Sequence, residues 1–182
     1  MKLNFLTNNQ FKIACANMAL QKYDIEVVPI NLDIPEIQAD TNIEIARESA
    51  KRAVELLGAP VAREDHGFFL DAYPGWPGPY MAHTERILPP EDLLRLLEGK
   101  ERTGYFEMAL AYLDPSGDVF ESSFRVPCSV SPTVQPGAKD FGWDPIITFG
   151  SDQRTISEYN QEDRYKMFLT NFERLGEHVK KA

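Results

Sequence analysis

The sequence predicts a single α/β domain over residues 1–182, built on a mixed β-sheet with flanking helices. Its length of 182 residues suits one domain. Hydrophobic residues make up 43% and charged residues 26% of the chain, which is enough for an ordinary globular core and surface. Segments with helical and strand periodicity alternate along the chain, and a long hairpin pattern follows, so parallel and antiparallel strands should share one sheet.

The first part of the chain alternates short strands with helices. Leu3–Leu6 is a short strand, and the side chains of Thr7-Asn8-Asn9 after it are favoured helix caps. The first helix is therefore expected over Gln10–Tyr23. Ile25–Val28 alternates like a second strand. Apolar residues at helical spacing predict a second helix over Asn42–Leu57, ended by the glycine that follows it.

The middle of the chain combines strand patterns with proline and glycine. Pro60–Arg63 and Gly67–Asp71 are predicted as two strand pieces around an acidic turn. Tyr73–Tyr80 is rich in proline and glycine, which favours a structured loop. Glu91–Glu98 is expected to form a short helix.

The remainder begins with two alternating segments, Tyr105–Leu113 and Val119–Val130. They flank Asp114-Pro115-Ser116-Gly117, a strong turn signal, so they are predicted to form a β-hairpin. Ile146–Phe149 is expected to be another short strand, and Asn160–Gly176 the closing helix.

The charge of the chain limits the partners that it can bind. The formal net charge is −9 and the pI is about 4.9. A nucleic-acid polymer needs a basic face that displaces counterions, so no such partner is expected. A small phosphorylated ligand is compatible with an acidic protein, because a few cations or a metal ion at one site are sufficient.

The cysteine content and the hydropathy favour a cytoplasmic protein. Cys15 and Cys128 cannot build a disulfide framework and are expected to be small buried residues in a reducing compartment. The first residues, Met1–Leu6, are too short and too polar in their flanks for a signal peptide. No apolar run approaches the roughly 20 residues that span a bilayer, so no membrane contact is expected.

A first group of polar residues lies at a predicted strand-to-helix junction, from Thr7 through Asn9 to Lys12. Backbone N–H groups at the start of a helix bind anions, and Lys12 lies about one turn into the helix. The junction therefore suits phosphate. The alternative is a simple helix cap beside a solvated lysine.

A second group consists of scattered acids: Asp33 and Glu36, and then the pair Glu64-Asp65. Mg²⁺ prefers a few carboxylates together with water and phosphate oxygens. Asp65 follows an apolar run and is expected at a strand end, where ligands gather in α/β sheets. The alternative is that these acids are ordinary surface charge.

A third group is Asp140-Phe141-Gly142-Trp143-Asp144-Pro145. Aromatic faces beside a glycine can stack a nucleobase, which contributes roughly 1–3 kcal/mol per base. An aromatic turn that packs into the core fits the same spacing equally well.

Together these groups form a series of motifs whose order matches one family. The chain resembles the inosine triphosphate pyrophosphatases over nearly its whole length. Any one motif is weak, whereas the ordered series is specific. The matching segments are Thr7-x-Asn9-x-x-Lys12, Asp33–Gln38, Glu64–Phe68, Pro77–Tyr80 and Phe141–Pro145.

The resemblance implies a fold and a reaction. The fold would be an elongated mixed sheet with flanking helices and two lobes around a deep cleft, in a homodimer. The reaction would be Mg²⁺-dependent hydrolysis of inosine, deoxyinosine or xanthosine triphosphate between the α and β phosphates. The products would be a nucleoside monophosphate and pyrophosphate.

The resemblance also implies roles for individual residues. Glu36 and Asp65 would hold the metal, and Asp65 with Lys12 would be catalytic. A carboxylate such as Asp65 can orient or deprotonate the attacking water, while lysine and Mg²⁺ stabilise charge on the phosphate oxygens. The substrate-binding residues would be Thr7, Asn9, Lys12, Arg47, Phe141, Gly142, Trp143, Asp144 and Arg164.

Several positions depart from the family pattern. The Ser-His-Arg segment that reads the purine falls on Phe168, Leu169 and Thr170, and the lysine before it is Arg164. Elsewhere, Cys15 replaces a glutamate, Arg47 stands for the lysine of the second helix, and His83 stands for an arginine of bacterial relatives.

The phosphate and metal residues are thus retained, whereas those that read the base are not. Specificity depends on polar groups that the wrong ligand leaves unpaired. We therefore expect triphosphate cleavage to persist and base preference to be relaxed or moved, even toward pyrimidine or modified nucleotides. The alternative is a nucleotide-binding or regulatory protein with weak or no catalysis. Retention of Lys12, Glu36 and Asp65 favours the enzyme.

Overall fold

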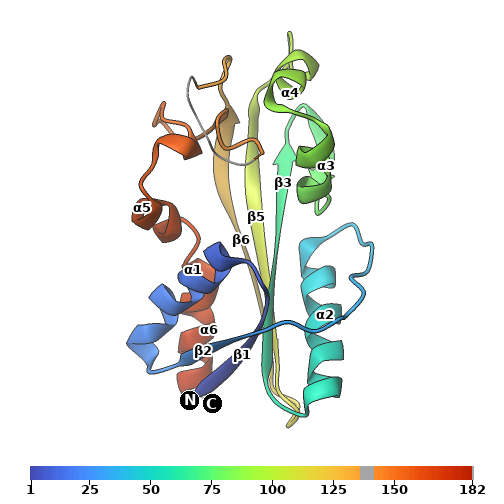
Figure 1. The fold of residues 1–182 in the computed structure, drawn as a ribbon, viewed down its shortest axis with the longest axis vertical. Helices are drawn as coiled ribbons and strands as arrows, with labels where there is room; N and C mark the ends of the chain where they lie inside the picture. The colour runs from blue at the N-terminus through green and yellow to red at the C-terminus, as the bar shows by residue number, and fades with distance from the viewer. Residues whose placement is uncertain (136–141, 182) are drawn as a thin grey trace. The chain divides into compact units, whose positions relative to one another are not determined.

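The computed structural model describes residues 1–135 and 142–181, which form a mixed α/β fold (Figure 1). In chain order the elements are β1 (Lys2–Leu6), α1 (Gln10–Leu20), the 3₁₀-helix η1 (Gln21–Tyr23), β2 (Glu26–Ile30), α2 (Asn42–Leu57), β3 (Val61–Leu70), β4 (Tyr73–Gly78), α3 (Met81–Ile87), α4 (Pro90–Leu96), β5 (Thr103–Leu113), β6 (Val119–Val130), β7 (Ile147–Phe149), the 3₁₀-helix η2 (Ile156–Glu158), α5 (Gln161–Lys166) and α6 (Thr170–Lys181).

The described strands form one mixed sheet of seven, which confirms the predicted fold class. The order is β2-β1-β3-β5-β6-β7, with β4 paired to β3 outside this path. β1 is parallel to both β2 and β3, whereas β4 is antiparallel to β3 and β7 is antiparallel to β6. The predicted hairpin is confirmed: β5 and β6 are neighbours, and Gly117 N donates to Asp114 O at 2.9 Å in the turn between them.

The chain folds into two compact units. Strands β3, β5 and β6 contribute residues to both. Unit 1 comprises Met1–Asp65, Met108–Phe124 and Tyr165–Ala182, and unit 2 comprises His66–Glu107 and Arg125–Arg164.

In unit 1, helices cover both faces of the sheet because consecutive side chains of β1 point to opposite sides. Phe5 meets Phe172 of α6 edge-on, with ring centroids 5.4 Å apart. Its neighbour Leu6 packs with Ala53 of α2 and Val61 of β3. Figure 1 accordingly shows α1 and α6 on one side of these strands and α2 on the other. The polar loop after β1 leaves the sheet where this strand ends, with Thr7 buried and Asn8 and Asn9 exposed.

Helix α2 has the predicted bounds. The hydroxyl of Thr41 accepts a hydrogen bond from Glu44 N at 3.4 Å and caps the start, while Gly58 ends the helix with a φ of 61°. Ala46 and Ala50 are fully buried against Ala111 of β5. These small side chains let the helix approach the sheet closely, which holds the first residue of α2 beside β3.

The predicted acidic turn between two strand pieces is wrong, because β3 runs unbroken from Val61 to Leu70. Glu64 and Asp65 are inside the strand and only 1% and 9% exposed. Strand β3 lies between β1 and β5 in the sheet, and buried polar partners bind the acid side chains, so tertiary structure overrides the polar local signal.

The predicted loop over Tyr73–Tyr80 is also wrong. Residues Tyr73–Gly78 form β4, which pairs antiparallel with β3 in the register Phe68 to Gly78 and Phe69 to Pro77. Among the described strands β4 pairs with β3 alone, and such a strand tolerates proline because one side needs no donors. Helix α3, at Met81–Ile87, was not predicted.

The predicted closing helix is interrupted and ends later than expected. Phe168 N donates to Tyr165 O at 2.9 Å in a tight turn between α5 and α6, and the Phe168 ring lies 5.3 Å from that of Phe11 in α1. Helix α6 then continues through Gly176 to Lys181. A Cβ at Gly176 would lie 2.2 Å from the ring of Tyr23, so this glycine permits close packing instead of ending the helix.

Unit 2 is held together by an aromatic cluster. The Trp143 ring is 5.6 Å from Phe68 and 6.3 Å from Trp76, and Phe106 is 5.1 Å from Phe68. Trp143 is 1% exposed, and its indole N–H donates to Leu88 O at 2.9 Å. The turn that contains Trp143 is therefore anchored in the aromatic core of unit 2.

Two further expectations concern cysteines and membranes. Cys15 and Cys128 are both free and buried, as predicted, and burial raises the pKa of each thiol to about 12. Within the described ranges, no helix has the length and the apolar character that crossing a membrane requires.

Candidate functional site

The loop between β1 and α1 is organised by its own side chains. Asn9 caps α1, its side-chain oxygen accepting from Phe11 N at 2.9 Å and from Lys12 N at 3.3 Å. The Thr7 hydroxyl accepts from Asn9 N at 3.1 Å, and Thr7 N donates to Ile30 O. The structure thus contains the cap that sequence alone left as an alternative. This cap fixes where α1 begins, and with it the point from which the Lys12 side chain extends.

Lys12 extends from the first turn of α1 to strand β3. Its ammonium donates to the backbone oxygen of Glu64 at 2.9 Å, in a partly buried position. Burial lowers the pKa of Lys12, and the neighbouring carboxylates oppose this effect, Asp65 more strongly than Glu64. Arg63 lowers and Glu36 raises the same pKa more weakly. Both predicted metal acids therefore lie within electrostatic reach of the Lys12 ammonium.

The acid pair on β3 is supported by two buried asparagines. Asn42, the first residue of α2, donates to Asp65 Oδ2 at 2.7 Å. Asn171 of α6 donates to Glu64 Oε1 at 3.5 Å and to Met108 O at 3.0 Å. Both asparagines are completely buried. The side-chain oxygen of each has no hydrogen-bond partner among the described residues. The carboxylate of Asp65 is consequently held in one orientation.

Glu36 lies in the segment between β2 and α2 and is paired with Arg63 of β3. Arg63 Nη2 is 2.7 Å from Glu36 Oε2, and Arg63 Nη1 donates to Leu6 O at 3.0 Å. The Glu36 side chain is 53% exposed, so its carboxylate is open to solvent and to ions. A pocket of about 140 Å³ lies here, lined by Leu6, Thr7, Asn8, Asn31, Leu32, Ile34, Glu36, Ser49 and Arg63.

The donor set fits Mg²⁺ only in combination with a ligand. No group of three or more His, Cys, Asp or Glu residues in the described part of the chain is arranged to hold a metal ion. Mg²⁺ uses one or two carboxylates together with water and substrate phosphates, and it does not require a cage made entirely of protein. Asp65 and Glu36 can supply such a partial set.

Arg47 stands where the family has a lysine in its second helix, and it was predicted to bind substrate. It is not among the residues that line the pocket. Its guanidinium forms a two-point ion pair with Glu121 of β6, with N–O distances of 2.5 and 2.7 Å. Ser49, two residues later on α2, lines the pocket. The helix therefore contributes a small hydroxyl there, and the positive charge comes from Arg63 of β3.

In unit 2 the aromatic motif contacts a carboxyl on α3. Trp143 N donates to Glu85 Oε1 at 3.2 Å. Gly142 has a φ of 60°, and a Cβ there would lie 2.6 Å from the same carboxyl oxygen, so only glycine fits. Burial, and to a smaller extent Asp144, raise the pKa of Glu85 to about 7 against the Trp143 hydrogen bond. Phe141 is outside the described residues.

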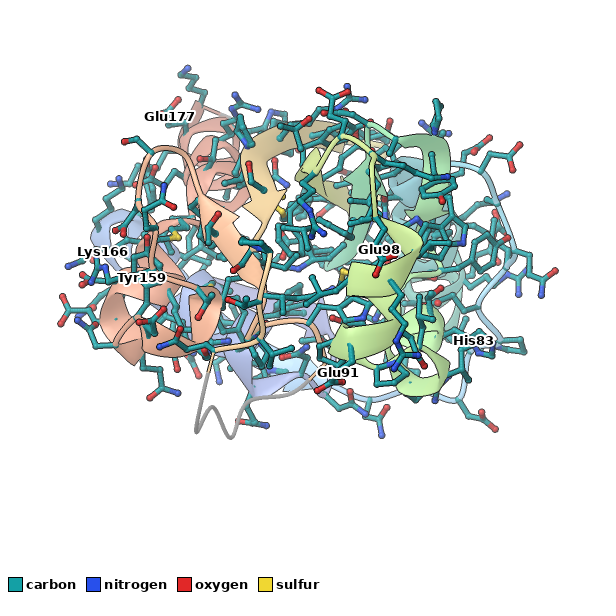
Figure 2. The ribbon with its side chains drawn as sticks, turned by 90° about the horizontal axis from the view of Figure 1, so that it is seen from above. His83, Glu91, Glu98, Tyr159, Lys166 and Glu177 are labelled. Carbon is teal, nitrogen blue, oxygen red and sulfur yellow. The ribbon has the colours of Figure 1, made fainter. Side chains whose placement is uncertain are left out.

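The other predicted base and sugar residues are also placed within unit 2. Arg164 Nη2 lies 2.5 Å from Asp144 Oδ2, so these two assigned residues are brought together. The Trp143 ring is buried, which leaves little aromatic surface for stacking. His83 on α3 is exposed at the outside, as Figure 2 shows, and Arg86 Nη2 is 3.4 Å from its Nδ1.

The positions of the missing Ser-His-Arg segment belong to unit 1. Phe168 is 7% exposed and packs its ring against Phe11, so this position is part of the core. Leu169 and Thr170 are partly exposed. The side chain of Phe168 thus has a packing role, and it has no polar group that could form a hydrogen bond with the edge of a base.

Sequence reasoning missed several residues that the structure brings to these sites. The sequence indicates Asn42 only as a helix start, and it places Glu64 among candidate metal acids without indicating the contacts of Glu64 with Asn171 and Lys12. Arg63 and Glu85 gave no signal beyond being charged residues in apolar or helical surroundings. A charged residue directly after the apolar run Val61-Ala62, in a segment expected to be a strand, is the pattern that could have drawn attention to Arg63.

The fold and the polar cluster define an α/β protein with carboxylates and basic groups gathered where its first parallel strands end. A family model then identifies the group: residues 3–168 match the Ham1 family, and the chain belongs to that family. This membership confirms the resemblance to the inosine triphosphate pyrophosphatases.

Individual relatives are similar over most of their length. A dITP/XTP pyrophosphatase of Methanopyrus kandleri is 37% identical over 170 residues, covering 92% of this chain and 89% of the relative. A dITP/XTP pyrophosphatase of Thermococcus kodakarensis is 32% identical over 168 residues, covering 92% and 90%. The Ham1 protein of Staphylococcus aureus has a similar fold, with a TM-score of 0.80 at 21% identity, covering 100% and 99% of the two chains.

Proposed function

We propose that this protein is a nucleoside triphosphate pyrophosphatase that cleaves between the α and β phosphates and releases pyrophosphate. Its substrates are non-standard purine triphosphates such as dITP, ITP and XTP, or nucleotides toward which its base preference has relaxed or moved. The observation that carries the proposal is the convergence of Asp65, Glu36 and Lys12 around the end of β1. The names of relatives that are 37% and 32% identical to this chain support it independently.

The reaction requires a water molecule to be positioned and negative charge to be neutralised. Asn42 fixes Asp65 through Oδ2, so the carboxylate can orient the water and accept its proton. Lys12, held by Glu64 O, stabilises charge on the phosphate oxygens. Asp65 and Glu36, together with phosphate oxygens, would hold Mg²⁺, which would supply further charge neutralisation. Little covalent chemistry is left, so positioning determines the rate.

The remaining assignments follow the sequence motifs. Thr7 and Asn9 would contact phosphates together with Lys12. Base and sugar would be bound by Gly142, Asp144 and Arg164, and by Phe141 and Trp143. Arg47 and Trp143 are the weakest assignments, because the charge of Arg47 is already paired with Glu121 and the Trp143 ring is buried. A homodimer in the cytoplasm, without nucleic-acid polymers as partners, completes the proposal.

The experiment is an assay of purified protein and Mg²⁺ with a panel of triphosphates, measuring pyrophosphate. Asp65→Asn should lower kcat by about 10² to 10⁴-fold while nucleotide binding persists. The amide oxygen can still accept from Asn42, so the fold should survive. Asp33→Asn is the matched control, because Asp33 is exposed and lines a different pocket.

The second candidate is a nucleotide-binding or regulatory protein. It is motivated by Phe168, which removes polar contact from a base-reading position. If the wild-type protein binds triphosphates but hydrolyses none of the panel, this candidate replaces the enzyme.

Relaxed base selectivity predicts ratios of kcat/KM near one between non-standard and standard purines, and also measurable pyrimidine turnover. A strong preference for ITP or XTP would contradict relaxed selectivity.

A further inference from the structure

Arg63 is a basic residue at the pocket beside the β1–α1 loop, and the proposed reaction gives it no function. It is the only cation among the residues that line this pocket. Its side chain is 19% exposed and is oriented by a hydrogen bond from Nη1 to Leu6 O. Its Nε is buried without a hydrogen-bond partner in the described part of the chain.

The charge balance of the cluster depends on this residue. Three carboxylates, those of Glu36, Glu64 and Asp65, act on Lys12 together with Arg63. Without Arg63, one ammonium would face three carboxylates, an arrangement that repels a polyanion before any metal binds. With Arg63 the cluster has two cations, one of which reaches the pocket.

The partner of Arg63 can be exchanged. Glu36 is 53% exposed, and ion pairs of such exposure contribute little to stability. A guanidinium also matches phosphate in geometry, since its planar fork can donate to two oxygens at once. An arriving phosphate can therefore take the donor that Glu36 now holds, while the Leu6 contact keeps the side chain in place.

We propose that Arg63 is a phosphate-binding residue of this pocket, donating from Nη2 to a polyphosphate oxygen in place of Glu36. Glu36 is released by the same exchange and becomes available to a divalent cation. That the polyphosphate belongs to a nucleoside triphosphate rests on the proposed function. The binding of phosphate by Arg63 does not depend on catalysis.

Calorimetry with inorganic tripolyphosphate, in EDTA and then with Mg²⁺, tests the proposal. Arg63→Met should weaken binding about tenfold or more, and Arg63→Lys should restore part of it. Arg52→Met is the matched control: Arg52 also pairs with a glutamate and a backbone oxygen, but it lines a different pocket. Its affinity for tripolyphosphate should match that of the wild type.

A second variant guards against loss of folding in Arg63→Met. Glu36→Gln leaves Arg63 intact and removes its ionic partner, so in EDTA it should bind tripolyphosphate more tightly than the wild type. If Arg63 served only as a structural ion pair, Glu36→Gln would tighten binding to the same extent with Arg63 present and in an Arg63→Met background, because the loss of a carboxylate charge favours any polyanion. Unchanged tripolyphosphate affinity in folded Arg63→Met and an equal gain from Glu36→Gln in the two backgrounds would overturn the proposal.

The two proposals fail in different ways. If no triphosphate is hydrolysed but tripolyphosphate binding depends on Arg63, the enzymatic function is lost and the phosphate role stands. If triphosphates are hydrolysed with KM and tripolyphosphate affinity unchanged by Arg63→Met, the enzyme stands and the Arg63 role is refuted. An increase in KM with little change in kcat is the expected kinetic result.

Discussion

Glu85 should make the stability of the protein depend on pH, and Glu85→Gln should remove that dependence. The carboxyl is partly buried and accepts a hydrogen bond from Trp143 N. Burial raises its pKa from 4.5 to about 7 in the folded protein. The folded state therefore holds the proton more tightly than the unfolded chain does, because ionisation inside the protein lacks solvent.

The sign and the magnitude follow from linkage between proton binding and folding. Between pH 4.5 and about 7 the folded state binds more protons than the unfolded state, so stability falls as pH rises. Each pH unit between the two pKa values corresponds to about 1.4 kcal/mol, which gives at most about 3 kcal/mol over the whole interval. The contribution is complete below the unfolded pKa and is lost above the folded one.

The measurement is urea unfolding of the wild type and Glu85→Gln at several values of pH from 4.5 to 8. The glutamine amide can still accept from Trp143 N but cannot ionise. The free energy of unfolding of the variant, minus that of the wild type, should increase with pH across this interval and level off above it. Parallel pH curves for the two proteins would refute the reasoning.

Two further predictions concern packing and support. Asn42→Leu removes the hydrogen bond to Asp65 Oδ2. It should lower kcat for pyrophosphate release at least tenfold with a smaller effect on KM, because the orientation of Asp65 is lost; unaltered kcat would contradict this role. Gly176→Ala places a methyl group against the ring of Tyr23. It should cost about 1–3 kcal/mol of unfolding free energy, measured by urea titration, and a variant as stable as the wild type would contradict the described packing.

Much of the fold was predictable because local patterns and tertiary structure agree. Helix α2 combines a threonine cap, apolar periodicity and a terminal glycine, and all three signals lie within the segment itself. The hairpin of β5 and β6 is similarly encoded by alternation around a strong turn. The failures have different physical origins. The middle of β3 lies in a sheet whose other strands are distant in the chain, which a local pattern cannot reveal, whereas β4 forms a hairpin with β3 and its proline and glycine residues conceal the strand.

The candidate site follows the same division. Thr7, Asn9, Lys12 and Asp65 stand in recognisable motifs, so the sequence sufficed to select them. The partners that orient Lys12 and Asp65 are remote in the chain, and no local spacing connects them. Asn171 is 107 residues from the acid that it contacts, for example, and its own segment has no sign of a polar role.

The anchor of Lys12 is a main-chain oxygen, not a side chain. Every amino acid at position 64 offers this same acceptor, provided that the strand keeps its path. The residue at position 64 can therefore change during evolution without displacing the Lys12 ammonium. The position of this ammonium depends on the backbone of β3 and not on the side chain of residue 64.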